Sequence, residues 1–432
     1  MSGSTDTVCQ ALEVAGISNL FAVRGGGHNL WGAGSIHDGV LIDMSAMNTT
    51  TYDPSTGIAS IQAGSRWGDA YEVLESHGVM VGGGRESDVS VAGLTIGGGI
   101  SWYSPRLGLV CDQVKNFEVV LASGEITNAN QTENADLWLA LKGGASNFGV
   151  VTRLDMYTIP VDPIWGGYLV SDKSTTAAHL RAFTNFVANN GKHPDSSYVV
   201  LWNYVKSAGD TVIARFLVNT KGVENPPELE ESLAIPTLVQ VTKKTTLTQL
   251  TREFSQPHGS FNFWYTATVK NDPNLLQKAV DLHGDMVQKL QSASSTGEFS
   301  TICFFQAVPT VLSEHGRARG GNSTGIDRLR DDNAVLFVAG ANTTDPELSG
   351  LAGELTACFC ADFKTYAESV GGLLPWIHGN HADGSQNPYC EKYNSNNTEI
   401  GMENLEKLRT AAKKYDPSGV FQTRVPGGHK LY

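Results

Sequence analysis

The sequence predicts an α+β protein, and three observations support this fold class. From Leu20 to about Pro160, short apolar runs alternate with glycine turns and one clear helix. After Pro163, alternating and aromatic-rich strands dominate, with amphipathic helices among them. The tail then returns to a helix and a polar, glycine-containing end. This order predicts a mixed, glycine-rich unit and a broad antiparallel sheet that helices cover on one face.

Each element of the first part follows from a short pattern. Apolar runs predict strands at residues 39–44 and 58–64, and residues 66–78 have helical periodicity with Gly78 as a stop. Two β-rich runs within residues 115–129 flank Ser123-Gly124, which is typical of a hairpin. A short helix is predicted at residues 135–144, where glycine ends it, and a strand at residues 148–159.

Six strand candidates lie between Trp165 and Thr343, at residues 165–172, 197–205, 211–220, 260–269, 299–308 and 333–343. Helical patterns occupy residues 175–190, 273–290, 346–370 and 402–415, with Asp416-Pro417 ending the last one. Period-two alternation allows four aromatic residues to reach the uncovered face of the sheet: Trp202, Tyr204, Trp264 and Phe305. They either belong to a core or form the wall of a flat pocket.

Composition excludes several classes of protein. The 432 residues carry 31 Lys and Arg against 44 Asp and Glu, a net charge of −13, which argues against nucleic acid and anionic lipid as partners. No apolar stretch approaches the roughly 18 residues that a membrane-spanning helix needs. Six cysteines without paired CxxC spacing indicate neither a zinc site nor a disulfide scaffold, and no metal site is predicted. The pair Cys358 and Cys360 is interpreted as buried packing.

Glycines occur in three clusters: VRGGGHN, VGGGRESDVSVAGLTIGGGIS and KGGASNFGVV. Successive glycines let several backbone N–H groups converge on an anion, although such clusters also form mere tight turns. A dinucleotide fingerprint is absent, because Trp102 stands where the last glycine after Gly97 and Gly99 should fall, and no P-loop motif is present. Any diphosphate would therefore be held across two loops.

The motifs in combination closely resemble the flavin-linked oxidases of the berberine bridge enzyme-like family, within the vanillyl-alcohol-oxidase superfamily. The resemblance rests on RGGGHN, on GGGRESDVSVAGLTIGGGISWYSPRLGLVCDQV, on ENADLWLALKGGASNFGVVT, and on GNHADGSQNPYCEKYNSNN near the end. It covers nearly all of the chain from about residue 20, and the VPGG ending resembles fungal sequences from secondary metabolism.

The resemblance implies a two-domain, PCMH-type FAD-binding fold. Residues 1–160 and 371–432 would form the FAD-binding domain, apparently short at its start, and residues 161–370 the substrate domain. His28 matches the histidine that bonds covalently to the 8α-methyl group of the flavin. The remaining implied cofactor residues are Arg24, Gly25, Gly26, Gly27, Asn29, Val89, Gly93, Gly97, Gly98, Gly99, Val150 and Asn380. The glycines would hold the diphosphate through N–H donors, and Val150 would lie near the adenine end.

Several positions depart from the family pattern. Glu86 stands where many relatives have a second tethering cysteine, so a single tether is expected, with Cys111 interpreted as packing. Val89 matches the position that gates dioxygen, and its small size is permissive. His381 replaces the tyrosine that commonly assists deprotonation, and it either acts as a base through its ordinary pKa near 6.5 or only lines the site. Gln306 matches a strand position that faces the flavin and would hydrogen-bond substrate.

The expected activity is that of an FAD-linked oxidase that takes hydride from a small phenolic or alkaloid-like metabolite and passes electrons to dioxygen to form hydrogen peroxide. The alternatives are a flavin-containing cyclase or pericyclase without net redox, a carbohydrate oxidase, or an inactive or binding-only flavoprotein. The expected partners are the small-molecule substrate and dioxygen, with no nucleic acid or membrane. Five Asn-x-Ser/Thr sequons hint at a secretory route, and no signal peptide is visible in the sequence.

Overall fold

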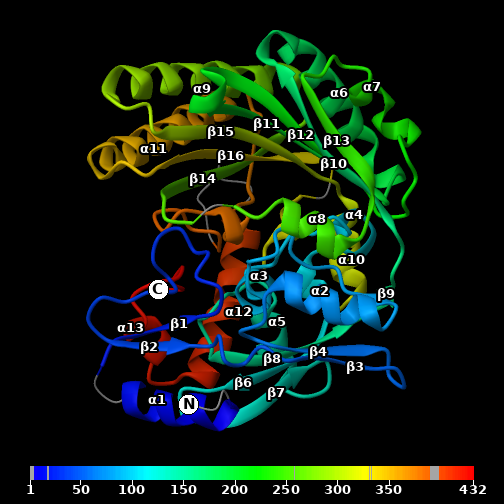
Figure 1. Ribbon diagram of the computed structural model, residues 1–432. Helices are drawn as coiled ribbons and strands as arrows, with labels where there is room; N and C mark the ends of the chain where they lie inside the picture. Colours follow the sequence, from blue (N-terminus) through cyan, green and yellow to red (C-terminus); the bar gives the residue numbers. More distant parts are fainter. Residues whose placement is uncertain (1–3, 17–18, 257, 330, 332, 390–397) are drawn as a thin grey trace.

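The computed structural model describes residues 4–16, 19–256, 258–329, 331, 333–389 and 398–432. Two units lie one above the other (Figure 1). One holds an eight-stranded antiparallel sheet, and the other holds a five-stranded sheet, a pair of parallel strands and the C-terminal helices. The α+β architecture with a large antiparallel sheet confirms the predicted fold class.

The eight-stranded sheet has the order β13-β10-β12-β11-β15-β16-β14-β17. All neighbouring strands in it are antiparallel, as their registers show. Its strands are β10 (Ile164–Asp172), β11 (Ser196–Val205), β12 (Asp210–Asn219), β13 (Val239–Thr245), β14 (Phe261–Lys270), β15 (Phe299–Val308), β16 (Ala334–Thr343) and β17 (Leu373–Leu374). Six of these were predicted, whereas the two outermost, β13 and β17, lack an apolar run long enough to indicate a strand.

Three amphipathic helices cover the face of this sheet that is turned away from the other unit: α6 (Thr176–Asn189), α9 (Pro273–Ala293) and α11 (Pro346–Ser369). All three were predicted from their periodicity. Leu180 of α6, Leu276 of α9 and Phe363 of α11 are at most 3% exposed and join one core with Val200 and Phe337 of the sheet. This core fixes the helices to the sheet, whereas Val199 and Val218, on the other face, join the core of the second unit.

The aromatic residues on the strands divide between the two faces. Trp202, Tyr204 and Phe305 are buried in the core beneath the helices, where the Trp202 and Phe305 rings meet edge to face 5.6 Å apart. The possibility that they form a pocket wall is therefore wrong for these three. Trp264 points to the opposite face of the sheet, away from the helices, where its ring lies 5.4 Å from that of His381. One position along a strand decides which face a side chain takes.

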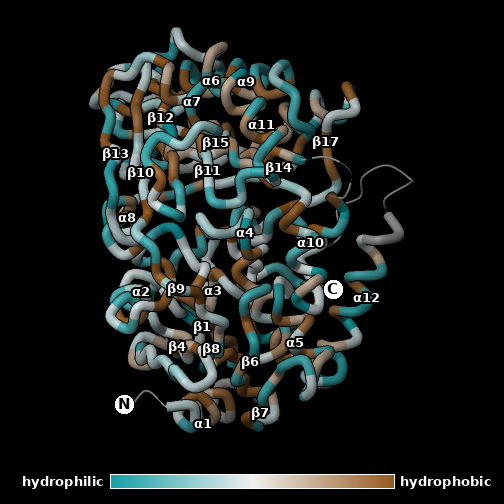
Figure 2. Tube along the Cα trace, turned by 90° about the vertical axis from the view of Figure 1, so that its right-hand side faces the viewer, coloured by the Kyte–Doolittle hydropathy of each residue, from teal (hydrophilic) through white to brown (hydrophobic). Residues whose placement is uncertain are grey.

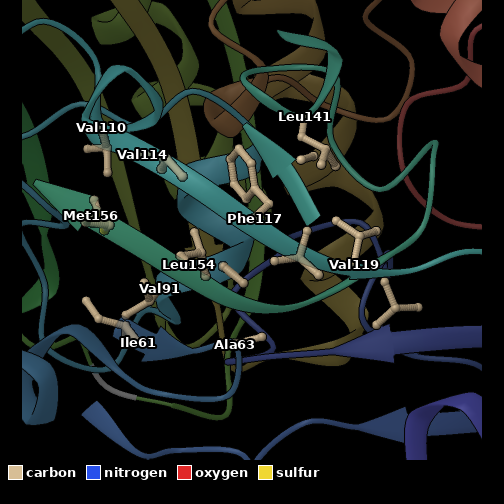
Figure 3. Packing of buried hydrophobic residues seen from close by; sticks show 14 of the residues in the cluster. Ile61, Ala63, Val91, Val110, Val114, Phe117, Val119, Leu141, Leu154 and Met156 are labelled. Carbon is tan, nitrogen blue, oxygen red and sulfur yellow. The ribbon is translucent and has the colours of Figure 1, made fainter. Parts of the chain in front are cut away.

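The second unit contains a sheet with the order β3-β4-β8-β6-β7. Its strands are β3 (Thr50–Asp53), β4 (Ile58–Gln62), β6 (Val114–Val120), β7 (Ile126–Asn130) and β8 (Val150–Tyr157), with helices α2 (Trp67–Ser76) and α5 (Ala135–Leu141) beside them. Figure 3 shows Phe117 and Leu154 packing with Val91 and Leu141 in its core. The predicted hairpin is β6 and β7, and α2 ends one residue before His77, which Gly78 follows with φ +72°.

The two ends of the chain meet in this unit. Strands β1 (Phe21–Arg24) and β2 (Val40–Asp43) pair in parallel. Phe21 donates its backbone N–H to Arg424 O at 2.9 Å, and its ring meets Phe421 of α13 (Val420–Thr423) edge to face. Helix α12 (Thr398–Tyr415) packs along α5 and ends before Asp416, as predicted. The proposed boundaries near residues 160 and 370 stay predictions, but these contacts agree with a C-terminal segment that returns to the first unit.

The remaining elements are shorter or lie outside the two large sheets. They are α1 (Thr5–Gly16), β5 (Val79–Met80), α3 (Val91–Ile96), α4 (Ser104–Leu107), β9 (Ile159–Pro160), α7 (Glu230–Leu233), α8 (Leu247–Glu253) and α10 (Val311–Ala318). Helix α8 packs on α2, with Thr248 N donating to Glu75 Oε1 at 3.0 Å. Apolar segments run along the strands and helices of both units (Figure 2). No described helix has the length and apolar character needed to cross a membrane.

Candidate functional site

The first glycine cluster forms a loop directly after β1 and packs tightly against the second cluster. A Cβ at Gly25 would lie 2.6 Å from Ser90 Oγ, and one at Gly26 would lie 2.8 Å from Ser90 N. Only glycine permits this approach. Within the described residues, the N–H groups of residues 25–28 have no hydrogen-bond acceptor. The loop therefore presents consecutive unused backbone donors, which fit an anionic ligand such as a diphosphate.

Within the second cluster, the stretch from Gly97 to Gly99 differs from the prediction that its N–H groups hold the diphosphate. Gly98 N donates to Thr95 O at 3.0 Å, and Gly99 N donates to Asn380 Oδ1 at 2.9 Å. Asn380 Nδ2 returns a hydrogen bond to Leu94 O at 3.1 Å. These donors already have acceptors, so the cluster brings the segment around Asn380 close to α3 rather than offering free N–H groups.

The loop at residues 320–327, for which the sequence suggests no role, seals this region. Thr324 Cγ2 would meet a Cβ at Gly98 or Gly143, both of which have positive φ. The fully buried pair Lys142 and Asp112, 3.6 Å apart, holds the loop, since Lys142 Nζ donates to Gly321 O at 2.5 Å and Asp112 Oδ1 accepts from Asn322 Nδ2 at 2.9 Å. The structure thus ties a loop between β15 and β16 of the large sheet onto the glycine-rich unit.

His28 stands at the mouth of the first loop beside Glu86. Its Nε2 lies 3.9 Å from Glu86 Oε2, and within the described residues neither His28 Nε2 nor Glu86 Oε1 has a hydrogen-bond partner, although both are buried. Glu86 Oε2 accepts from Asp88 N at 3.1 Å and from Val89 N at 3.0 Å. Burial is the main cause that lowers the pKa of His28, so a neutral imidazole is favoured. A neutral imidazole is the nucleophilic form, as covalent attachment requires.

His381 lies under the open face of the large sheet. Its ring is 5.4 Å from Trp264, 6.2 Å from Phe304 and 4.9 Å from His378. Burial, and then the neighbouring His378 and Arg85, lower the pKa of His381 well below 6.5. The expectation of a base with an ordinary pKa is therefore wrong, because the ring is desolvated among apolar neighbours. His381 is neutral at neutral pH and a weaker base than predicted.

Gln306 projects from β15 toward Arg85, a residue that sequence reasoning missed. Arg85 Nη1 donates to Gln306 Oε1 at 2.7 Å, and its guanidinium lies 5.3 Å from the centre of the Trp102 ring. Desolvation lowers the pKa of Arg85 to about 10, so it stays charged. The available signal was a charged residue that directly follows three glycines, Gly82 to Gly84.

Other residues singled out from the sequence lie farther from this arrangement. Arg24 pairs with Asp43 at 2.6 Å in a partly exposed ion pair, and Asn29 Oδ1 accepts from Trp31 N and Ala33 N, which shapes the first loop. The roles predicted for Gly93 and Val150 stay untested. Two cysteine predictions differ in outcome: Cys111 is fully buried, but Cys358 is exposed, since helix positions two apart face different sides.

Comparison with known proteins identifies an FAD-binding domain in this chain. A family model described as an FAD binding domain matches residues 2–130. The chain is 36% identical to the FAD-dependent monooxygenase sdcF of Emericella nidulans over 417 residues, which covers 95% of this chain and 85% of the relative. The chain belongs to the family of FAD-dependent oxidoreductases that includes this fungal relative.

Solved structures of this FAD-linked oxidoreductase fold align over nearly the whole chain. Glucooligosaccharide oxidase from Acremonium strictum has a TM-score of 0.77 at 19% identity and covers 99% of this chain and 90% of its own. The wild-type BBE-like 1 protein of Physcomitrella patens has a TM-score of 0.72 at 21% identity, with coverage of 99% and 90%. The glucooligosaccharide oxidase is described as having a 6-S-cysteinyl, 8α-N1-histidyl FAD.

The residues present fit FAD in this oxidoreductase. The loop of Gly25 to Gly27 offers unused donors to a diphosphate, and a buried, unpaired imidazole nitrogen of His28 lies at its end. The expectation of a single covalent tether, based on Glu86 in place of a second cysteine, stays a prediction.

Proposed function

We propose that this chain holds FAD through a single covalent bond to His28 and oxidises a small aromatic metabolite at the open face of the large sheet. The observation that carries the proposal is the partly buried imidazole of His28 at the end of a backbone cradle, whose Nε2 has no hydrogen-bond partner among the described residues. On the open face of the large sheet, Trp264, Phe304 and His381 supply an aromatic wall suited to a flat substrate. Bound FAD supplies the two-electron acceptor for hydride removal.

The protein side chains orient the substrate and move its proton. Gln306 and Arg85 present polar donors beside the aromatic wall. The neutral ring of His381, whose buried Nδ1 has no partner among the described residues, is placed to take a substrate proton as hydride leaves. Val89, whose backbone N–H donates to Glu86 Oε2, is the residue whose small side chain would admit dioxygen to the cofactor. The overall reaction consumes one O₂ and forms one H₂O₂ for each substrate oxidised.

A second function, monooxygenation, is favoured by the name of the fungal relative. A monooxygenase inserts one oxygen atom into the product and consumes a further reductant such as NADPH. Peroxide formed in equal amount to the oxidised product supports the oxidase, and ¹⁸O from labelled O₂ in the product supports the monooxygenase. Product that forms without net consumption of O₂ identifies the third candidate, a cyclase.

Replacing His28 tests the covalent link. In the wild-type protein, flavin absorbance is expected to stay with the polypeptide after acid precipitation, whereas His28→Ala is expected to release all of it. His37→Ala alters an exposed histidine farther along the same loop and serves as the control, with covalent flavin retained. Flavin that stays attached to the His28→Ala protein would contradict the assignment, and mass spectrometry of the flavinylated peptide locates the bond directly.

A further inference from the structure

Arg85 is a desolvated cation whose charge is not neutralised by the protein. No carboxylate of the described residues lies within ion-pair distance of it, and its hydrogen bond within that part of the chain goes to the neutral amide of Gln306. Arg215, the other deeply placed arginine, differs. It donates to the backbone oxygens of Ser232 and Ile235 and to Ser171 Oγ, so its donors are used in packing. Arg85 keeps most of its donors available.

These donors face a cavity between the two units. Residues of the second glycine cluster and of the segment that follows it line this cavity, together with the start of β11 and the end of β15; among them are Arg85, Ser101, Trp102, Tyr198, Gln306 and Pro309. The Trp102 ring supports the guanidinium from one side. Arg85 approaches the aromatic wall through β15, because its partner Gln306 stands two residues after Phe304 and therefore on the same face of that strand, and the Phe304 ring meets His381.

The local charge is unusual for this molecule. The chain as a whole carries a net charge of −13. The imidazoles of His378 and His381 are held neutral by burial, which lowers the pKa of His378 to about 3. A lone positive charge in a desolvated pocket attracts an anion strongly, because little water screens it. The planar fork of arginine matches the two oxygens of a carboxylate or a phenolate with its neighbouring oxygen.

We propose that Arg85, oriented by Gln306 and Trp102, binds an anionic oxygen of the substrate, so that the enzyme acts on an aromatic acid or an ionised phenol. The inference rests on the proposed function, since it names the substrate class of the same site. Gln306 is a positioning residue in this arrangement, because its Oε1 accepts a hydrogen bond from Nη1 of Arg85 and leaves the other N–H groups of the guanidinium to the ligand. The aromatic wall selects the ring and Arg85 selects its charge.

The test uses the flavin-containing protein with benzoate and benzyl alcohol, two ligands of similar shape that differ in charge. Binding is measured by the change in flavin absorbance. Wild-type protein is expected to bind benzoate at least tenfold more tightly than benzyl alcohol. Arg85→Gln is expected to weaken the binding of benzoate by tenfold or more and to change the binding of benzyl alcohol by less than twofold. Arg85→Lys should retain part of the preference for benzoate. Arg106→Gln is the matched control, because Arg106 already pairs with Asp195 at 3.0 Å.

The outcomes separate this inference from the proposed function. Wild-type protein without a preference for benzoate would overturn it, even if peroxide forms with a neutral substrate. A preference that survives in Arg85→Gln would do the same. If Arg85→Gln instead lowers the reduction potential of the flavin and leaves the affinity for benzoate unchanged, the charge of Arg85 acts on the cofactor and the inference fails. Loss of benzoate binding in a protein that oxidises no substrate would retain the inference and defeat the proposed oxidase activity.

Discussion

At the scale of single residues, burial decides what a side chain named by the sequence can do. His28 and His381 were both indicated by motifs, and desolvation lowers the pKa of each, but the consequences differ. A neutral His28 is a better nucleophile for attachment to a cofactor. A His381 that resists protonation is a weaker base than its residue type suggests. Glu86, which stands where many relatives have a second cysteine, accepts hydrogen bonds from the backbone N–H groups of Asp88 and Val89 next to His28.

Ala145 gives a prediction about stability at this scale. It has φ +54° within the third glycine cluster, a left-handed conformation that costs a residue with a Cβ about 1 kcal/mol. Ala145→Gly is therefore expected to raise the free energy of unfolding by about 0.5 to 1 kcal/mol in urea titrations. Ala140→Gly, inside α5, is the control and should lower it by about 1 kcal/mol. Destabilisation of equal size in both variants would show that the strain at Ala145 is not relieved.

At the scale of elements, a side chain completes the edge of the large sheet. Strand β17 pairs with β14 only at Thr268 and Val269, which leaves the rest of that edge uncovered. Gln386 fills the next position, since its Nε2 donates to Thr266 O at 2.7 Å and its Oε1 accepts from Thr266 N at 3.0 Å. The same amide oxygen accepts from Asp383 N. Gln386 thereby attaches the segment that carries His381 to the strand that carries Trp264.

Removing this amide should loosen both the edge and the site. Gln386→Ala loses two hydrogen bonds to the strand, which is expected to cost about 1 to 3 kcal/mol of unfolding free energy. It should also raise KM more than it lowers kcat, because the wall formed by His381 and Trp264 is displaced while the cofactor stays attached. Gln277→Ala, on the exposed side of α9, should change stability by less than about 0.5 kcal/mol. Equal effects of the two substitutions would contradict this role for Gln386.

At the scale of the whole molecule, several histidines are buried in neutral form. Burial lowers the pKa of His283 and His378 to about 3, and that of His179 and His429 to about 4. In the unfolded chain each titrates near 6.5, so between about pH 3 and 6.5 the unfolded state binds more protons. Their contribution to stability is therefore present above pH 6.5 and is lost as the pH falls toward the folded values.

Acidification is thus expected to destabilise the protein well before its carboxylates titrate. Each such histidine with a folded pKa of about 3 should cost about 2 kcal/mol between pH 7 and pH 5, measured as the unfolding free energy in urea. His283 is remote from the site and hydrogen-bonds Thr301 Oγ1 at 2.8 Å, so His283→Gln should reduce the pH dependence without changing the flavin. A free energy that is constant from pH 7 to 5 would refute the argument.

The sequence alone determined the strand and helix order, the α+β class, the glycine cradle and the family, because periodicity, turn residues and motifs are local along the chain. Helix α2, the hairpin of β6 and β7, and His28 after three glycines could all be predicted in this way. Short edge elements such as β13 could not, since pairing with a neighbour rather than their own pattern makes them strands.

Only the tertiary structure decided which side chains meet. It buried Trp202 and Phe305 in the core and left Trp264 at the site, brought Arg85 to Gln306 across 221 residues, and occupied the N–H groups of Gly98 and Gly99. It also desolvated His381 and so removed the ordinary pKa that its residue type implies. The physical reason is that charge, hydrogen bonding and pKa depend on neighbours distant in sequence, whose distances are set only when the two units pack together.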